Sequence, residues 1–214
     1  SFAQPDEQPP HKVLVTEFWI GKFGVTNAQY ASFARAAGID FSFREGCERH
    51  PVVRIAFDEA RSFCDWLGQL NKRAIRLPTE AEWEKAARGA DGRIYPWGNA
   101  WNPAALNSGI GGAGDIAPVD RHAPLGDSPY GASDLSGNVW EWIADWYSPT
   151  TFADRVANDD FIVDPGGPAS GTHRVLKGGC HYLRQSATRS ARRFRYAPAM
   201  RCYDIGFRVV VELG

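Results

Sequence analysis

The pattern of apolar residues predicts three helices in the first half of the chain. In each helix, apolar side chains recur at three- and four-residue spacings, which places them on one face. Thr26 and Thr79 each precede a Gln or Glu at the third helical position, which forms a capping box, and Asp58 is the expected cap of the second helix. Gly38 and Gly89 are the expected ends of the first and third helices. The three apolar stripes are Tyr30, Phe33, Ala34 and Ala37; Ala60, Phe63, Cys64 and Leu67; and Trp83, Ala86 and Ala87.

Beyond Gly89 the helical pattern stops. Residues 90–173 contain most of the Gly and Pro, and so long an irregular region is usually functional or held by ions and polar networks. Strand-like runs lie at Lys12–Ile20, Arg174–Lys177 and Gly206–Glu212, and we expect the last to pair with the first. No repeat or linker divides the 214 residues. The sequence therefore predicts one α+β domain over residues 1–214, in which loops outweigh regular structure.

The charges are unevenly distributed. Residues 174–214 carry 9 Lys and Arg against 2 Asp and Glu, whereas residues 1–173 carry 15 against 23. A basic tail can bind anions or nucleic acid, or its arginines can stack on rings and pair with carboxylates of the body. Aromatic and small apolar residues separate most of these basic residues, so the second interpretation is favoured and no nucleic-acid partner is expected. No apolar run approaches the roughly 20 residues of a membrane helix.

The four cysteines, Cys47, Cys64, Cys180 and Cys202, form no CxxC motif and no cluster with histidine at metal-ligand spacing. Up to two disulfides are open to them. Cys64 lies on an apolar helix stripe, so it is interpreted as a buried thiol. The compartment, cytoplasmic or exported, is left open.

Glu141 lies between Trp140 and Trp142 in an apolar run. Burial of a carboxylate costs several kcal/mol unless a cation or several donors meet it. The run therefore either ligates a metal or anchors an internal hydrogen-bond network.

The chain resembles the formylglycine-generating enzyme (sulfatase-modifying factor) family over nearly its whole length. The resemblance rests on several segments in the family's order. They read Phe18-Trp19-Ile20-Gly21-Lys22, Val25-Thr26-Asn27-Ala28-Gln29-Tyr30, Arg76-Leu77-Pro78-Thr79-Glu80-Ala81-Glu82-Trp83-Glu84, Tyr95-Pro96-Trp97-Gly98-Asn99, Ala117-Pro118-Val119-Asp120, Asp134-Leu135-Ser136-Gly137-Asn138-Val139-Trp140-Glu141-Trp142, Arg174-Val175-Leu176-Lys177-Gly178-Gly179 and Ile205-Gly206-Phe207-Arg208. The resemblance implies a C-type lectin-like fold with little regular structure.

The family includes copper oxidases that form formylglycine, iron enzymes of thiohistidine synthesis, proteins of siderophore maturation, and non-catalytic binding proteins. The binding proteins include the variable proteins of diversity-generating retroelements, which vary between the Gly-Gly and Gly-Phe-Arg motifs. The copper oxidases bind Cu(I) through two cysteines four residues apart after Gly-Gly, because soft thiolates select Cu(I). Here only Cys180 follows Gly179, and Cys202 lies 22 residues further on. Copper is therefore not expected, and Cys180 remains only a weak catalytic candidate.

The resemblance also implies a structural Ca²⁺ site in the segment 134–141. By direct match its ligands are Asp134, Gly137, Val139 (through its carbonyl) and Glu141, and oxygen ligands from a tight loop suit this hard cation. The alternative is that Glu141 accepts hydrogen bonds without a metal. A second calcium site of the family would lie near Asn107 and Ser108, but the following loop is shorter than the family's and lacks its aspartate.

The tail between Cys180 and Asp204 is rich in Tyr, Arg and Phe, the residues that carry binding energy at interfaces. We expect a monomeric binding module for an unidentified protein or small molecule, with a C-terminal segment (174–208) that a retroelement could diversify. The alternative is a metal-dependent oxidoreductase of the formylglycine-generating, thiohistidine-forming or siderophore-maturation type. The expected ligand-binding residues are His181, Tyr182, Leu183, Arg184, Arg193, Phe194, Tyr196, Arg201, Cys202, Tyr203 and Asp204.

Overall fold

Two small sheets form the centre of the protein. The computed structural model describes residues 3–109, 112–157 and 162–213. The first sheet has the strand order β1-β7-β2 and the second the order β5-β4-β3-β6. Their bounds are β1 Phe18–Ile20, β2 Ile75–Arg76, β3 Trp140–Trp146, β4 Arg174–Lys177, β5 Phe194–Tyr196, β6 Ile205–Gly206 and β7 Val210–Glu212. All neighbouring strands are antiparallel except β3 and β6. The expected pairing of the last strand with the first is confirmed by β7 and β1.

Four α-helices and three short 3₁₀-helices accompany the sheets. Their bounds are α1 Asn27–Ala37, α2 Phe57–Asn71, α3 Glu80–Arg88, α4 Thr151–Ala157, η1 Pro5–Glu7, η2 Pro103–Ala105 and η3 Gln185–Ala187. The predicted capping boxes at Thr26 and Thr79 are confirmed. Asp58 is not the cap of α2; Ala56 holds that position, and its N–H donates to Glu59.

Regular structure in the second half of the chain exceeds the expectation. α4 and β3 lie in the region predicted to be irregular. The predicted strand over Lys12–Ile20 shortens to β1, and the strand over Gly206–Glu212 divides into β6 and β7. The division occurs where the side chain of Arg208 turns into the interior, with no exposed surface.

The apolar stripes of the helices pack into two clusters. The larger one joins α1 and α2 to β3, β4 and β6, and includes Tyr30, Phe63 and Trp142. The smaller one lies around Trp83 of α3 and Ile143 of β3. Both clusters therefore anchor β3, which gives the second sheet a rigid centre.

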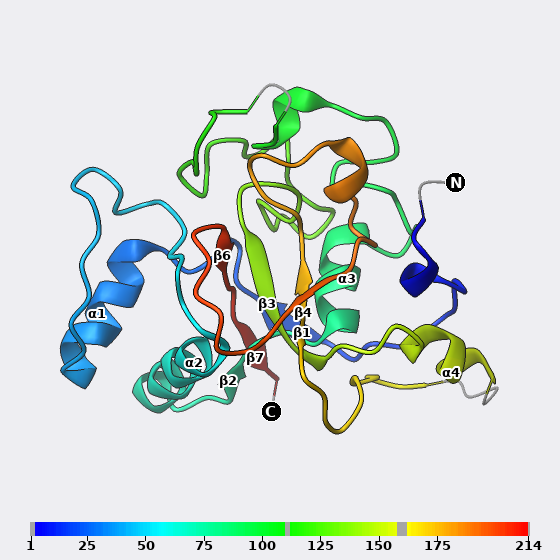
Figure 1. Cartoon of the computed structure of the whole chain (residues 1–214), viewed down its shortest axis with the longest axis horizontal. Helices are drawn as coiled ribbons and strands as arrows, with labels where there is room; N and C mark the ends of the chain where they lie inside the picture. The colour runs from blue at the N-terminus through cyan, green and yellow to red at the C-terminus, as the bar shows by residue number, and fades with distance from the viewer. Residues whose placement is uncertain (1–2, 110–111, 158–161, 214) are drawn as a thin grey trace.

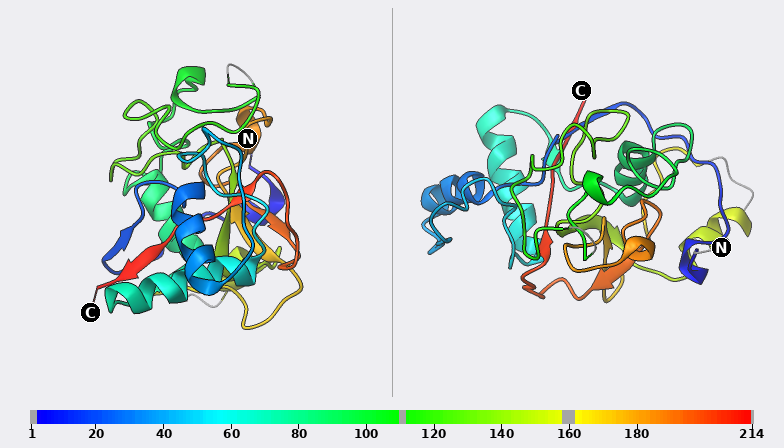
Figure 2. Two further views of the ribbon diagram at one scale, coloured as in Figure 1. Left: turned by 90° about the vertical axis from the view of Figure 1, so that its left-hand side faces the viewer. Right: turned by 90° about the horizontal axis from the view of Figure 1, so that it is seen from above.

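The long connection between α3 and β3 lies at one end of the molecule, away from the C-terminus (Figures 1 and 2). The segment that follows β4 rises to the same end, where Gly109 donates its N–H to the carbonyl of Leu183 at 2.9 Å. The candidate binding segment is therefore supported by loops on one side and by the second sheet on the other. Among the described helices, none is long and apolar enough to cross a membrane.

Candidate functional site: an exposed tyrosine patch after the Gly-Gly turn

The Gly178–Gly179 turn directs the chain out of β4. Both glycines have positive φ, 98° and 80°. A Cβ at Gly179 would lie 2.9 Å from the carbonyl oxygen of Ala187. Only glycine satisfies both conditions, so the turn is fixed by sterics, and the chain reaches the surface at Tyr182.

Four residues from two separate segments meet beyond this turn, and we call them the tyrosine patch: His181, Tyr182, Tyr203 and Asp204. The rings of Tyr182 and Tyr203 are 6.1 Å apart, and the His181 ring lies 5.1 Å from that of Tyr182 and 6.1 Å from that of Tyr203. Tyr182 and Tyr203 are 48% and 52% exposed, whereas His181 and Asp204 are buried. The patch thus presents two aromatic rings on a buried polar base.

Hydrogen bonds fix the base of the patch to β3 and to the turn before it. The Tyr182 hydroxyl donates to the Asp204 carboxylate at 2.6 Å. The N–H of Trp140 donates to the Asp204 carbonyl at 2.8 Å, and the N–H of His181 donates to the Asn138 carbonyl at 2.9 Å. Burial, and then the hydrogen bond to Asp204, raises the pKa of Tyr182, so its hydroxyl stays protonated at neutral pH.

Cys180 lies beneath the patch and is fully buried. Burial raises the pKa of its thiol to about 12. Burial also raises the pKa of Cys202, which is half-buried. All four cysteines are free. Because the thiolate is the form that attacks substrates and binds metals, burial of Cys180 disfavours its reactive form.

The remaining expected ligand-binding residues do not share one surface. Arg193 was expected to be exposed, but its side chain is buried and makes a bidentate pair with Glu80 at 2.7 and 3.0 Å. Phe194 stacks on Trp140 at 5.2 Å, and Arg201 pairs with Glu59. Tyr196 lies opposite Arg174 in the β4–β5 register, at the far end of β4 from the Gly-Gly turn. Leu183 is half-buried and Arg184 is exposed, next to the patch in sequence.

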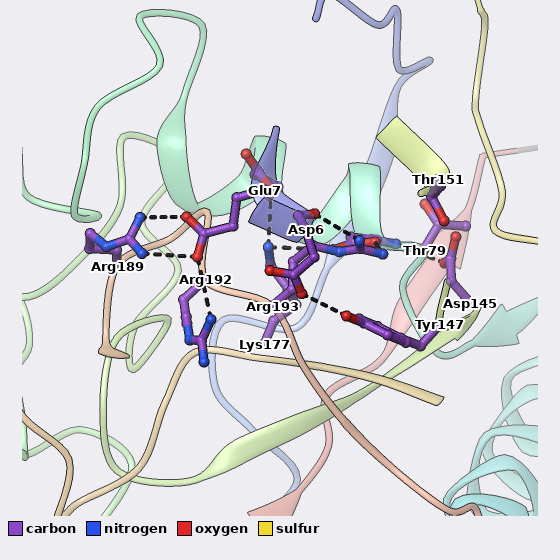
Figure 3. A network of polar contacts seen from close by, with 12 residues as sticks. Asp6, Glu7, Thr79, Asp145, Tyr147, Thr151, Lys177, Arg189, Arg192 and Arg193 are labelled. Atoms are coloured by element: carbon purple, nitrogen blue, oxygen red, sulfur yellow. Dashed lines mark hydrogen bonds and ion pairs between the residues drawn. The ribbon is translucent and has the colours of Figure 1, made fainter. Parts of the chain in front are cut away.

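The arginines that follow η3 attach this segment to the N-terminal region. Arg189 makes a bidentate pair with Glu7 at 2.7 and 2.9 Å, and Arg192 lies 3.6 Å from the same carboxylate (Figure 3). Arg193 also donates to the carbonyl of Asp6 at 2.9 Å. The interpretation of the basic tail as packed and paired guanidiniums is confirmed for these residues.

The segment 134–141 holds its two carboxylates in different environments. Glu141 accepts hydrogen bonds from Trp83 Nε1 at 2.6 Å and from Arg208 Nε and Nη2 at 2.7 Å each. Asp134 has positive φ and accepts from the Asn138 amide at 3.2 Å; burial raises its pKa to about 7. A cation would therefore stabilise the charged form of Asp134, whereas a cation at Glu141 would compete with Arg208. Within the described ranges, no three His, Cys, Asp or Glu side chains are grouped to hold a metal.

Two residues that hold this part of the structure together, Asn138 and Arg208, were not predicted from the sequence. Asn138, with φ of 63°, accepts from Asn107 and from the N–H of Ala117, and it donates to the Ala117 carbonyl. It ties the loop between α3 and β3 to the base of the patch. The partner of Glu141 is Arg208, 67 residues away. The Gly137-Asn138 pair is typical of a tight turn and could have drawn attention to Asn138. No signal in the neighbouring sequence identifies Arg208 as the partner of Glu141.

Two cavities lie elsewhere. One, of about 840 Å³, is lined by residues 9–15 and by α3. The other, of about 430 Å³, lies between α2, β2 and β4. The patch residues line neither cavity, so the patch is a surface feature and is not part of either of these cavities.

The fold and the Gly-Gly turn define a loop-rich α+β protein with a C-terminal surface segment, and the comparisons identify its family. The family model described as "Sulfatase-modifying factor enzyme 1-like domain" matches residues 1–213, so the chain belongs to this family. It is 31% identical to a formylglycine-generating enzyme of Streptomyces coelicolor over 94% of this chain and 80% of that protein.

Two solved structures share the fold. PvdO from Pseudomonas aeruginosa has a TM-score of 0.84 at 23% identity, and the match covers 99% of this chain and 87% of that one. Variable protein 1 of Treponema denticola has a TM-score of 0.81 at 24% identity, covering 97% and 89%. The expected C-type lectin-like α+β fold of the formylglycine-generating enzyme type is thereby confirmed.

Proposed function

We propose that the protein is a binding module that recognises a protein or small-molecule ligand through the tyrosine patch. One observation carries the proposal: two neighbouring tyrosine rings are about half exposed on a base that is hydrogen-bonded to β3 and the turn before it. Tyrosine supplies a large amphipathic contact area at low cost in conformational entropy, and it is enriched among residues that dominate binding energy.

The fixed base makes the patch suited to binding. Tyr182 is held by Asp204, whose backbone is in turn hydrogen-bonded to Trp140. A side chain that is already ordered before the ligand arrives loses little rotamer freedom on binding. The exposed Arg184, which follows the patch in sequence, adds a charge that can select the partner.

The state of Cys180 favours binding over catalysis by the copper-oxidase route. The sequence has no second cysteine at the family's spacing, and the buried thiol has its pKa raised to about 12. The metal-dependent oxidoreductase is the second candidate, and the formylglycine-generating enzyme of Streptomyces coelicolor supports it. The fold shared with a variable protein supports the finer proposal that a retroelement diversifies the patch residues.

Binding by the patch can be tested on arrays of proteins and glycans. The Tyr203→Ala variant is expected to lose at least about 2 kcal/mol at the ligand that the wild type selects, because this ring is an exposed aromatic contact and its removal leaves the hydrogen bond between Tyr182 and Asp204 in place. Tyr130→Ala is the matched control, since Tyr130 is 56% exposed and lies outside the patch. Equal signals for the three proteins would refute the proposal.

The catalytic alternative has its own test. Wild-type protein is incubated in aerated buffer, which supplies O₂ as the oxidant, with Cu(I) and a cysteine-containing sulfatase peptide, and the peptide mass is measured. Formylglycine formation would replace the binding proposal with the enzyme. For diversification, coding sequences from a cell population are expected to differ at the patch codons and to be uniform in the codons of β3.

We also propose a structural calcium ion at the segment 134–141, held by the Asp134 carboxylate with carbonyl oxygens of Gly137 and Val139. The half-buried Asp134 side chain and its raised pKa support this proposal, because a cation would offset the desolvation of the charge. The hydrogen bonds of Glu141 to Arg208 and Trp83 weigh against Glu141 as a ligand at the same time.

A further inference from the structure

A second cavity, distinct from the tyrosine patch, is lined by three arginines. It has a volume of about 430 Å³ and lies between α2, β2 and β4. Arg61, Arg76 and Arg174 line it, and Asp65 is its only carboxylate. Arg174 begins β4, whereas the Gly-Gly turn follows the end of β4. The cavity and the patch thus start from opposite ends of the same strand.

The three arginines differ in how far carboxylates of the protein compensate their charges. Arg76 is compensated, because it pairs with Glu82 at 2.7 Å and with Glu212 at 2.6 Å. Arg61 has only Asp58, at 3.6 Å and largely in solvent. Within the described part of the chain, Arg174 forms no salt bridge. Its Nη1 donates to the Ala144 carbonyl at 2.5 Å, and its Nε is buried without a hydrogen-bond partner.

The stacking of Arg174 determines how a ligand could reach it. Its guanidinium carbon lies 3.5 Å from the ring centre of Trp146 and 4.1 Å from that of Phe57. With two rings packed against it, the guanidinium has its N–H donors left at the edge, in the plane of the group. That edge matches the two oxygens of a carboxylate or phosphate.

The electrostatic environment of Arg174 also favours an anion in this cavity. Burial, followed by the charge of Arg61, lowers the pKa of Arg174, and the charges of Asp58 and Asp145 offset this effect only in part. Arginine nevertheless stays charged in proteins. An anion near both guanidiniums would offset the desolvation and the effect of Arg61 together.

We propose that this cavity binds a small organic anion through its carboxylate or phosphate group, with the edge of Arg174 and the side chain of Arg61 as the recognising groups. Phe57, Ile75 and Leu77 also line the cavity and can cover an apolar part of the ligand. The thiol of Cys64 lines it as well, but burial raises its pKa to about 12, so binding is non-covalent. This inference is independent of the function proposed for the tyrosine patch.

The test uses inorganic phosphate, benzoate and the uncharged benzamide at constant ionic strength. Binding is followed by calorimetry and by the arginine Nε–H signals in NMR spectra, with Arg174→Lys identifying the Arg174 signal. Benzoate or phosphate is expected to bind saturably and to shift that signal, whereas benzamide does neither. Loss of either arginine is expected to weaken binding about tenfold, because a charge-assisted contact disappears.

Variants on α2 keep the inference falsifiable even if Arg174→Lys fails to fold. Arg61→Gln changes an exposed residue and is expected to weaken benzoate binding about tenfold. Asp65→Asn removes the carboxylate that lines the cavity and is expected to strengthen benzoate binding by roughly fivefold. Arg73→Gln is the control, since Arg73 stacks on Trp19 and does not line the cavity. Absence of saturable binding, or equal affinity in Arg61→Gln, would overturn the inference.

Discussion

Glu141→Gln is the substitution whose effect the structure defines most closely. The side chains of Glu141 and Arg208 are almost completely buried and lie 2.7 Å apart. Glutamine keeps the shape of the side chain but removes the charge, so the guanidinium of Arg208 remains buried without its counter-ion. Removing one partner of a buried pair costs about 3–5 kcal/mol. Because glutamine retains one acceptor, we expect the lower end, about 3 kcal/mol.

Thermal and urea unfolding measure this loss. For a domain of this size, about 3 kcal/mol corresponds to a fall in Tm of roughly 6–12 °C. Asp58→Asn is the matched control: Asp58 faces Arg61 at 3.6 Å, but its side chain is 82% exposed. An exposed pair contributes about 0–1 kcal/mol, so this control is expected to melt close to the wild type.

The difference in stability between the two variants shows whether burial of the Glu141–Arg208 pair matters. If Glu141→Gln loses no more stability than Asp58→Asn, the buried pair is not what holds β3 to the segment around Arg208. The measurement is made in chelator and in calcium, because the expected loss does not require the metal. A loss seen only in calcium would assign Glu141 to the ion and not to Arg208.

Three further changes have defined outcomes. Asp145→Asn is expected to stabilise the protein at pH 8 by up to roughly 3 kcal/mol and to have little effect at pH 4. Burial raises the pKa of Asp145 to about 6, so between about pH 4 and pH 6 the folded state retains a proton that the unfolded chain has lost, and the stability of the wild type falls as pH rises through this range. If urea unfolding gives the same stability difference between Asp145→Asn and the wild type at pH 4 and at pH 8, this explanation is contradicted. Thr79→Ala should lower stability by about 1 kcal/mol, because its hydroxyl accepts from the Glu82 N–H at the start of α3; an unchanged melting temperature would show that this cap is dispensable. Asp134→Asn should abolish the rise in Tm that calcium gives the wild type, and equal rises in both proteins would exclude Asp134 as a ligand.

Local signals made the helices predictable from the sequence. Caps and apolar stripes lie within a few residues of one another, so Thr26, Thr79 and the glycines after them identify α1 and α3. β3 was missed as a strand because neighbouring residues on both of its faces are buried, which removes the alternation that marks a half-exposed strand.

The candidate site was predictable only in part. The composition of the tail indicated both aromatic contacts and packed guanidiniums, but it did not assign each residue to one role. Arg193 finds its partner Glu80 113 positions away, and Arg208 finds Glu141 67 positions away. Such pairs depend on how the chain crosses itself, so the burial of Arg193 could not be read from its neighbours in sequence.

The tail separates anchoring side chains from exposed ones, and this separation bears on how the protein could change its ligand. Arg189 and Arg193 attach one part of the tail to Glu7 and Glu80. Tyr203 has no such buried ion pair, so substitution there would leave the core pairs intact. Tyr182 is different, because its hydroxyl satisfies the buried carboxylate of Asp204. A change at Tyr182 is therefore tolerated only if Asp204 changes with it. Otherwise the unpaired buried carboxylate of Asp204 would destabilise the segment that leads into β6.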